Sequence, residues 1–350
     1  MDFTSLIRED LRGLKPYLPD RYRIDSDKPV WIDANENPFD GKWGRYPDPT
    51  HKKLRRKIGK LRNISSENVF VSHGSDEAID LIIRTFCMPG QDTISILNPV
   101  FEMYAHAAHI ASVKVNTFSM KAPYQPGTEL ANQILAIPSK VLFLCSPNNP
   151  TGGSLPIEFV QHLLNHWKGM LVIDEAYIDF SDKESFLHSI QNHPNLIVLQ
   201  TFSKAFGLAG LRIGMTFAQK WVVDILEAVK LPYNMSQSSC EIAMQKLENV
   251  GLPHDQIKTI KSEKDRISKA LGQFNFVEEV YPSDANFLLV KCSEAMSIYQ
   301  WLMSEGIYVR LRKDKECENC IRLSIGTPVE NNQCLHKLST YQEKLKSETV

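Results

Sequence analysis

The sequence predicts an α/β fold in which a larger domain, built on a mostly parallel seven-stranded sheet flanked by helices, precedes a smaller α+β domain. Three observations predict it. Between about residues 65 and 215, short β-rich segments alternate with segments whose apolar residues recur at helical spacing. These β-rich segments are apolar throughout, which is typical of strands buried on both faces of a parallel sheet. After about residue 218 the chain changes to long helical patterns and shorter strands.

The larger domain is expected to contain seven strands with helices between them. The strands are expected at Asn68–Ser72, Asp92–Leu97, Val113–Phe118, Val141–Cys145, Met170–Ile173, Leu196–Gln200 and Leu211–Phe217. The helices are expected at Ser75–Cys87, Phe101–Ile110 and Pro156–His166. The first helix is typical, because Ile79, Ile82, Ile83 and Phe86 fall on one face. Strands that alternate with helices in this way predict parallel crossovers.

The second half of the chain predicts a different layout. Helices are expected at Gln219–Lys230, Gln237–Asn249 and His254–Leu271, strands at Asn286–Val290, Tyr308–Arg310 and Ile321–Ile325, and a polar helix at the end. We therefore divide the chain into an N-terminal arm (1–30), a larger domain (31–235) and a smaller domain (236–350). The arm is expected to pack on the smaller domain or on a partner subunit.

Composition excludes several classes of function. The formal net charge of the 350 residues is -1, so bulk electrostatics favours neither nucleic acid nor an anionic membrane. The densest basic run, His51–Lys57, carries apolar residues at helical spacing and is interpreted as a solvated helix face. No segment approaches the ~18 apolar residues of a membrane span, and no secretion signal is visible.

The seven cysteines also bear on the setting of the protein. They are odd in number and scattered, which favours reduced thiols in the cytoplasm over a disulfide framework. Cys317 and Cys320 form a lone CxxC pair without a second pair of ligands, so they are interpreted as plain thiols. No metal site is expected.

The segment from Thr201 to Gly214 is the most informative for chemistry. Lys204 follows an apolar strand, at the strand end where α/β sheets place their sites. A lysine that is desolvated there can lose its proton and act as a nucleophile. Ser203 and Arg212 lie close by and offer ligands for a phosphate. On this segment alone, a surface lysine in a glycine-rich turn is an equally simple interpretation.

Two further strand ends carry polar side chains. Asp174 ends an apolar strand, where a carboxylate can pair with a protonated ring nitrogen of a cofactor. Tyr177, three residues later, can donate to a phenolic oxygen. Asn149 lies in the tight turn Ser146–Gly152 after another strand, and its amide can reach the same ring. Each segment alone is also compatible with an ordinary loop or turn.

A Gly-Ser turn follows the first expected strand. The N–H groups of Ser75 and Asp76 open the next helix, and such groups bind phosphate well. The turn has neither the GxxxxGK[ST] nor the GxGxxG pattern, so it does not indicate a nucleoside-triphosphate or dinucleotide loop. An ordinary helix cap by Ser75 is the alternative.

Together these motifs resemble those of a known group of enzymes. Their order matches the class II group of fold-type I pyridoxal-5′-phosphate (PLP) aminotransferases: Gly74–Glu77, Pro147–Gly152, Asp174–Tyr177, Ser203–Lys204 and Leu211–Gly214. Asp33–Phe39 and Arg45–Pro49, with Ile178–Phe180 after Tyr177, narrow the resemblance to the histidinol-phosphate aminotransferase family. The resemblance runs from about Leu14 to Thr327.

The resemblance implies a role for each motif residue. Lys204 would bind PLP covalently and later move a proton, and Asp174 would pair with the ring nitrogen. Tyr177 and Asn149 would contact the ring oxygen O3′, and Tyr104 would stack on the ring. The phosphate ligands would be Ser75, Asp76, Thr201, Ser203 and Arg212. Tyr46 would reach the phosphate of a neighbouring subunit's cofactor, which implies a homodimer.

The resemblance also implies the substrates. The reaction would transfer an amino group between histidinol phosphate and 2-oxoglutarate, giving imidazole-acetol phosphate and glutamate in histidine biosynthesis. Arg322 and Arg310 match the arginines that bind substrate anions, because the planar guanidinium suits both phosphate and carboxylate. Tyr17 and Asn35 match further substrate contacts. The polar stretch Leu311–Cys320 between the two arginines departs from the family pattern and bears on specificity.

Other functions stay open at this point. An aromatic-amino-acid aminotransferase or a threonine-phosphate decarboxylase would share the PLP motifs. A PLP-binding transcription regulator would need an added DNA-binding domain, and the ~65 residues before the first strand show no helix-turn-helix pattern. A dinucleotide-dependent oxidoreductase would need the glycine-rich fingerprint that the chain lacks.

Overall fold

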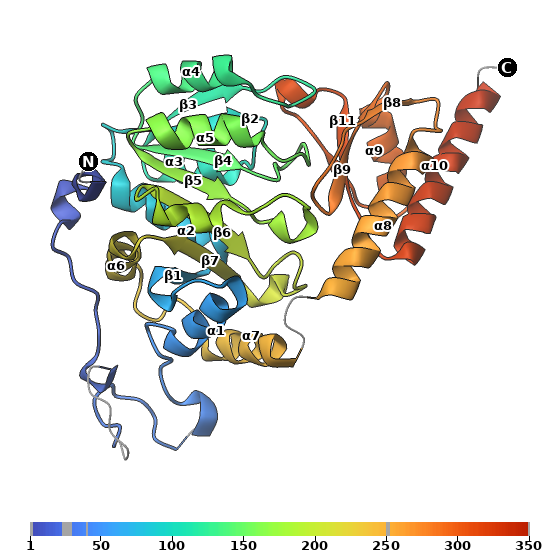
Figure 1. Cartoon of the computed structure of the whole chain (residues 1–350). Helices are drawn as coiled ribbons and strands as arrows, with labels where there is room; N and C mark the ends of the chain where they lie inside the picture. The colour runs from blue at the N-terminus through green and yellow to red at the C-terminus, as the bar shows by residue number, and fades with distance from the viewer. Residues whose placement is uncertain (1–2, 23–29, 40, 250–252, 349–350) are drawn as a thin grey trace.

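The computed structural model of the protein describes residues 3–22, 30–39, 41–249 and 253–348. These residues form two β-sheets that lie beside each other, each with its own helices (Figure 1). The larger sheet has the strand order β1-β7-β6-β5-β4-β2-β3. Its strands are β1 (Val69–His73), β2 (Thr93–Asn98), β3 (Lys114–Ser119), β4 (Val141–Cys145), β5 (Met170–Asp174), β6 (Leu196–Thr201) and β7 (Ile213–Ala218).

The larger sheet is mostly parallel, as the sequence predicts. Strands β3, β2, β4, β5 and β6 run parallel to one another. Strand β7 reverses direction and pairs antiparallel with both β6 and β1. All residues of β4, β5 and β6 are buried, which explains why these strands are apolar throughout and show no alternation.

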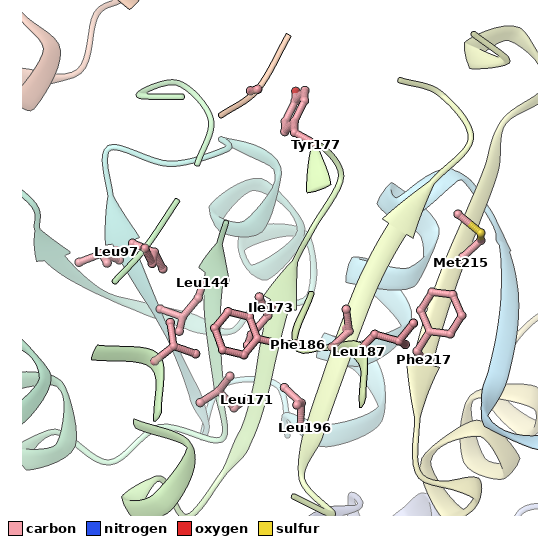
Figure 2. Packing of buried hydrophobic residues seen from close by; sticks show 14 of the residues in the cluster. Leu97, Leu144, Leu171, Ile173, Tyr177, Phe186, Leu187, Leu196, Met215 and Phe217 are labelled. Atoms are coloured by element: carbon pink, nitrogen blue, oxygen red, sulfur yellow. The ribbon is translucent and has the colours of Figure 1, made fainter. Parts of the chain in front are cut away.

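Helices cover both faces of this sheet. They are α1 (Lys52–Arg62), α2 (Gly74–Phe86), α3 (Met103–Ile110), α4 (Thr128–Ala136), α5 (Ile157–His166), α6 (Lys220–Val229) and α7 (Gln237–Asn249). Side chains alternate along β4, so that Leu142 and Leu144 pack with α5 whereas Val141 and Phe143 pack with α2. Figure 2 shows the α5 side, where Tyr177 lies at the end of the cluster beyond Ile173.

The smaller sheet is antiparallel, in the order β10-β11-β9-β8. Its elements are α8 (His254–Leu271), β8 (Val277–Val280), β9 (Phe287–Cys292), α9 (Ala295–Ser304), β10 (Arg310–Leu311), β11 (Cys320–Ser324) and α10 (Pro328–Glu348). Side chains of α8, α9 and α10 share a core with β9 and β11. Phe287 and Leu289 of β9 instead join the core of the larger sheet. This shared packing holds the smaller sheet against the larger one.

Three elements escape the sequence analysis because their apolar patterns are weak. Helix α4 buries only Ala131 and Ile134 completely. Strand β8 has the sequence VEEV and exposes both glutamates. Helix α9 exposes Met296 and Met303 outside its buried face, which hides the helical period. The strands and helices that the sequence predicts are confirmed, with ends that differ by a few residues.

The expected domain boundaries stay a prediction, but two contacts bear on them. In the N-terminal arm, the backbone N–H of Arg8 donates to Thr85 and its guanidinium to the carbonyl of Arg84, so this part packs on α2 and not on the smaller domain. Helix α7 packs against α1, and its Ala243 belongs to the core of the larger sheet. Within the described ranges, no helix is both long and apolar enough to span a bilayer.

A buried carboxylate lies beneath the end of β5. Glu175 is 1% exposed, and its carboxylate accepts hydrogen bonds from the Ser185 hydroxyl (2.5 Å), the Phe186 N–H (2.7 Å) and the Gln200 amide (2.9 Å). Burial nevertheless raises the pKa of Glu175 to about 7. The folded protein therefore keeps a proton that the unfolded chain releases near pH 4.5.

This group should make stability depend on pH. Between pH 4.5 and 7 the folded state binds more protons than the unfolded state, so the free energy of unfolding falls as pH rises. Glu175→Gln carries no titrating proton, and its amide can pair with the Gln200 oxygen, which is buried and has no partner among the described residues. We expect the wild type to lose ~2 kcal/mol more than this variant across that window, by urea unfolding at pH 5 and 7.5. Exposed Glu129→Gln is the control, and equal pH dependence in Glu175→Gln and wild type would refute the assignment.

Candidate active site

A pocket of about 400 Å³ opens where the carboxyl ends of β4, β5 and β6 meet the start of α2 and the strands β10 and β11. This is the position at which open α/β sheets bind ligands. Most residues singled out from the sequence line it: Ser75, Asp76, Asn149, Asp174, Tyr177, Thr201, Ser203, Lys204, Arg212, Arg310 and Arg322. The fold thus brings together groups that are up to about 250 residues apart, since Ser75 and Arg322 line the same pocket.

Asp174 is a buried carboxylate at the floor of the pocket. It is the last residue of β5 and is 3% exposed. The Tyr104 hydroxyl donates to Oδ2 at 2.7 Å, and the Ala176 N–H donates to Oδ1 at 3.0 Å. Burial raises the pKa of Asp174, whereas the Tyr104 hydrogen bond and the charge of Lys204 oppose that rise. A cationic ring nitrogen placed here would satisfy a charge that the protein itself leaves largely desolvated.

Lys204 lies in the turn after β6 and lines the pocket together with Arg322. Burial lowers the pKa of its amine, and the positive charge of Arg322 lowers it further, while Asp174 acts in the opposite sense. The amine nitrogen lies 5.4 Å from the centroid of the Tyr177 ring, and that ring packs edge-on against Phe287. A lysine with a lowered pKa supplies more neutral amine at pH 7, the form that attacks a carbonyl.

The start of α2 forms a cradle for an anion. Gly74 opens the helix at φ +75°, a left-handed conformation that favours glycine, and a Cβ there would press on the guanidinium of Arg212. Arg212 bonds to Asp76 at 3.0 Å, and the Thr201 hydroxyl donates to Ser203 at 3.0 Å on the facing wall. The first N–H groups of a helix have no carbonyl partner within it. Together with Arg212 they fit a phosphate group.

A second cluster of positive charge faces the pocket from the smaller sheet. Arg322 on β11 pairs in register with Arg310 on β10. Its guanidinium donates to the Asn149 side-chain oxygen at 2.5 Å, while its buried Nε has no partner among the described residues. Arg310 is exposed, whereas the Arg312 side chain is buried and bonds to Asp314 at 2.7 Å. These groups can bind a second anion, separate from the cradle at α2.

One expected contact is wrong. The resemblance predicts that Tyr104 stacks on a cofactor ring, but its side chain is completely buried and does not line the pocket. Its ring instead stacks on Phe143 at 4.8 Å, and its hydroxyl serves Asp174. Phe101 lines the pocket in its place, because α3 begins only at Met103 and leaves the preceding residues at the pocket wall.

Three expected residues lie outside this pocket. Tyr46 stacks on Tyr233 at 4.4 Å and, with Asn35, lines a different hollow. Tyr17 is 68% exposed. The structure of the single chain therefore does not bring these three residues to the site, and their roles stay predictions.

The pocket also contains residues that were not apparent from the sequence. Besides Phe101 they include Glu102, Cys145 and Arg312. Phe101 and Glu102 lie in the same segment as Tyr104. The motif predicts one aromatic residue beside the cofactor ring, and the resemblance matched that residue to Tyr104 and not to Phe101. Arg312 lies in the polar stretch after Arg310, where alternation along an extended strand would have placed both on one face.

Comparison with known proteins identifies the family. A family model described as aminotransferase class I and II matches residues 21–338. The chain belongs to the class I and II aminotransferases. The chain is 41% identical over 338 residues to a histidinol-phosphate aminotransferase of Parabacteroides distasonis, covering 96% of this chain and 98% of the relative. It is 40% identical over 341 residues to one of Flavobacterium johnsoniae, with the same coverage.

Solved structures agree on the fold of this aminotransferase. A histidinol-phosphate aminotransferase from Sinorhizobium meliloti, solved in complex with pyridoxal-5'-phosphate, superposes with a TM-score of 0.81. The match covers 87% of this chain and 85% of that chain at 24% identity. The family resemblance and the α/β fold expected from the sequence are thereby confirmed.

The charges around Lys204 give a test of the aminotransferase pocket. Arg322→Gln removes a nearby positive charge, so the pKa of Lys204 should rise, and Asp174→Asn removes a negative one, so it should fall. We expect the pH midpoint for acetylation of Lys204 in the cofactor-free protein, measured by mass spectrometry, to move up in the first variant and down in the second. Arg266→Gln on α8 is the control. Shifts of the same sign in both pocket variants would contradict the electrostatic account.

Proposed function

We propose that this aminotransferase uses PLP to transfer the amino group of histidinol phosphate to 2-oxoglutarate, giving imidazole-acetol phosphate and glutamate, as a step of histidine biosynthesis. The observation that carries the proposal is the presence in one pocket of two separate anion sites, the α2 cradle and the arginines of β10 and β11. One suits the cofactor phosphate and the other the anion of a substrate. The shared name of relatives that match nearly the whole chain supports this choice.

The pocket residues fit PLP. The cradle at Gly74, which a Cβ would fill, would hold the phosphate through Arg212, the N–H groups of Ser75 and Asp76 and the hydroxyls of Thr201 and Ser203. Asp174 would pair with the ring nitrogen, and Tyr177 and Asn149 would contact the ring oxygen. Phe101 would cover one face of the ring. When bound, PLP supplies an electron-poor ring that accepts the electron pair left by loss of a proton from Cα.

The side chains of this enzyme would carry the remaining chemistry. Lys204 would bind the cofactor and, once released, its amine would take the proton from Cα of the amino donor. Tyr104 would keep Asp174 ionised by donating to its carboxylate, so that the ring nitrogen stays protonated. Arg322, held by Asn149, would orient the donor by binding the phosphate of histidinol phosphate or a carboxylate of glutamate.

Further parts of the proposal concern residues outside the pocket. Tyr46, with its stacked partner Tyr233, would reach the cofactor phosphate of a second subunit, so the active form would be a homodimer. Tyr17 and Asn35 would add substrate contacts, and Arg310 would be a second arginine for a substrate anion. All seven cysteines are free, including the buried Cys317 and Cys320, which supports a cytoplasmic setting.

Turnover of competing donors tests the proposal. We expect the purified protein to be yellow and to bleach with histidinol phosphate. Its kcat/KM for this donor should be at least ~100-fold above the values for phenylalanine and threonine phosphate, because only histidinol phosphate carries both a phosphate and an imidazole ring. Lys204→Ala should fold but lose turnover by at least ~10³-fold. Activity confined to phenylalanine, or carbon dioxide release from threonine phosphate, would show that histidinol phosphate is not the substrate.

A further inference from the structure

Glu102 is an acidic residue beside the arginines of the pocket. It lies between β2 and α3, next to Phe101, and lines the pocket with Arg310, Arg312 and Arg322. Glu102 occupies the N-cap position of α3, yet its side chain makes no capping hydrogen bond. Acidic side chains at helix N-termini ordinarily bond to the free N–H groups there. The carboxylate of Glu102 points to the arginines instead.

The contacts of Glu102 are loose. One carboxylate oxygen lies 3.3 Å from Arg312 and the other 3.7 Å from Arg310. The side chains of Glu102 and Arg310 are each 61% exposed, so water screens their pairing and it contributes little to stability. Arg312, in contrast, is bonded twice to Asp314, at 2.7 and 2.9 Å. Glu102 and Arg310 can therefore separate at little cost, while Arg312 stays in place.

The two substrates of the proposed function differ in one of the groups that the site must bind, and Glu102 and Arg310 suit these two different groups. Histidinol phosphate carries a phosphate on one side of the reacting carbon and an imidazole on the other. Glutamate carries carboxylates on both sides. Arg322 suits the anion that both substrates have on one side. The other side of the site must accept an imidazole N–H donor in one half-reaction and a carboxylate in the other.

We propose that Glu102 and Arg310 form a separable ion pair that sets this dual specificity, with Glu102 accepting the imidazole N–H of histidinol phosphate and Arg310 binding the distal carboxylate of glutamate. The inference rests on the proposed function and deepens it. Each ligand binds the member of the pair whose charge complements it and leaves the other member to water. Glu102 is thus a specificity-determining residue, and it does not act on the reacting bonds.

The test measures binding without turnover. Imidazole-acetol phosphate and 2-oxoglutarate carry no amine, so they form unreactive complexes with the PLP-loaded enzyme, and calorimetry gives a Kd for each. In Glu102→Ala, we expect the Kd of imidazole-acetol phosphate to rise about tenfold, since a hydrogen bond to a charged group is lost. The Kd of 2-oxoglutarate should stay equal or fall, because Arg310 is then free. Glu102→Gln, which keeps an acceptor without the charge, should lie between the wild type and Glu102→Ala.

A neighbouring carboxylate provides the matched control. Asp314→Asn removes the other acidic partner of Arg312, and Asp314 itself is not among the residues that line the pocket. The ratio of the two Kd values should therefore stay within about twofold of the wild-type ratio. Equal changes for both ligands in Glu102→Ala, or the same selective loss in Asp314→Asn, would overturn the role of Glu102 and leave the proposed function standing. Failure of the wild type to bind imidazole-acetol phosphate at all would overturn both.

Discussion

The site depends on a carboxylate that the fold removes from water. Asp174 ends a fully buried strand, and its ionised form relies on the Tyr104 hydroxyl, the Ala176 N–H and the nearby Lys204. Desolvation acts on both charges in this pocket, raising the pKa of Asp174 and lowering that of Lys204. A cofactor that brings a cationic ring nitrogen and an aldehyde would satisfy both groups at once. The pocket is thus suited in advance to the group that the proposed chemistry needs.

The arrangement of strands explains how so few motifs build the site. Because β4, β5 and β6 are parallel and adjacent, the residues that follow them meet at one edge of the sheet. The antiparallel pairing of β1 with β7 then places the start of α2 beside Arg212. The smaller sheet shares a core with the larger one through Phe287 and Leu289, and so holds Arg322 against Asn149.

Much of this could be predicted from the sequence, and the failures have physical causes. Asp174 and Lys204 could be recognised because each follows or ends a strand that is apolar throughout, and a buried strand gives this pattern in the sequence. The role expected for Tyr104 was wrong, because a motif does not tell whether its aromatic side chain faces the pocket or the core. Here the side chain is buried and donates to Asp174. Glu102 gave no signal, because its importance comes from arginines more than 200 residues away. The roles of Tyr46 and Tyr17 stay predictions, because the single chain does not bring either residue to this pocket.

Covalent attachment of PLP at Lys204 is the central claim, and it can be read directly. The holoenzyme is reduced with borohydride, digested, and its peptides are mapped by mass spectrometry. The account predicts that the reduced cofactor remains on the peptide that contains Lys204 and on no other lysine. A cofactor mass on a different lysine, or none on any peptide of a yellow preparation, would contradict it.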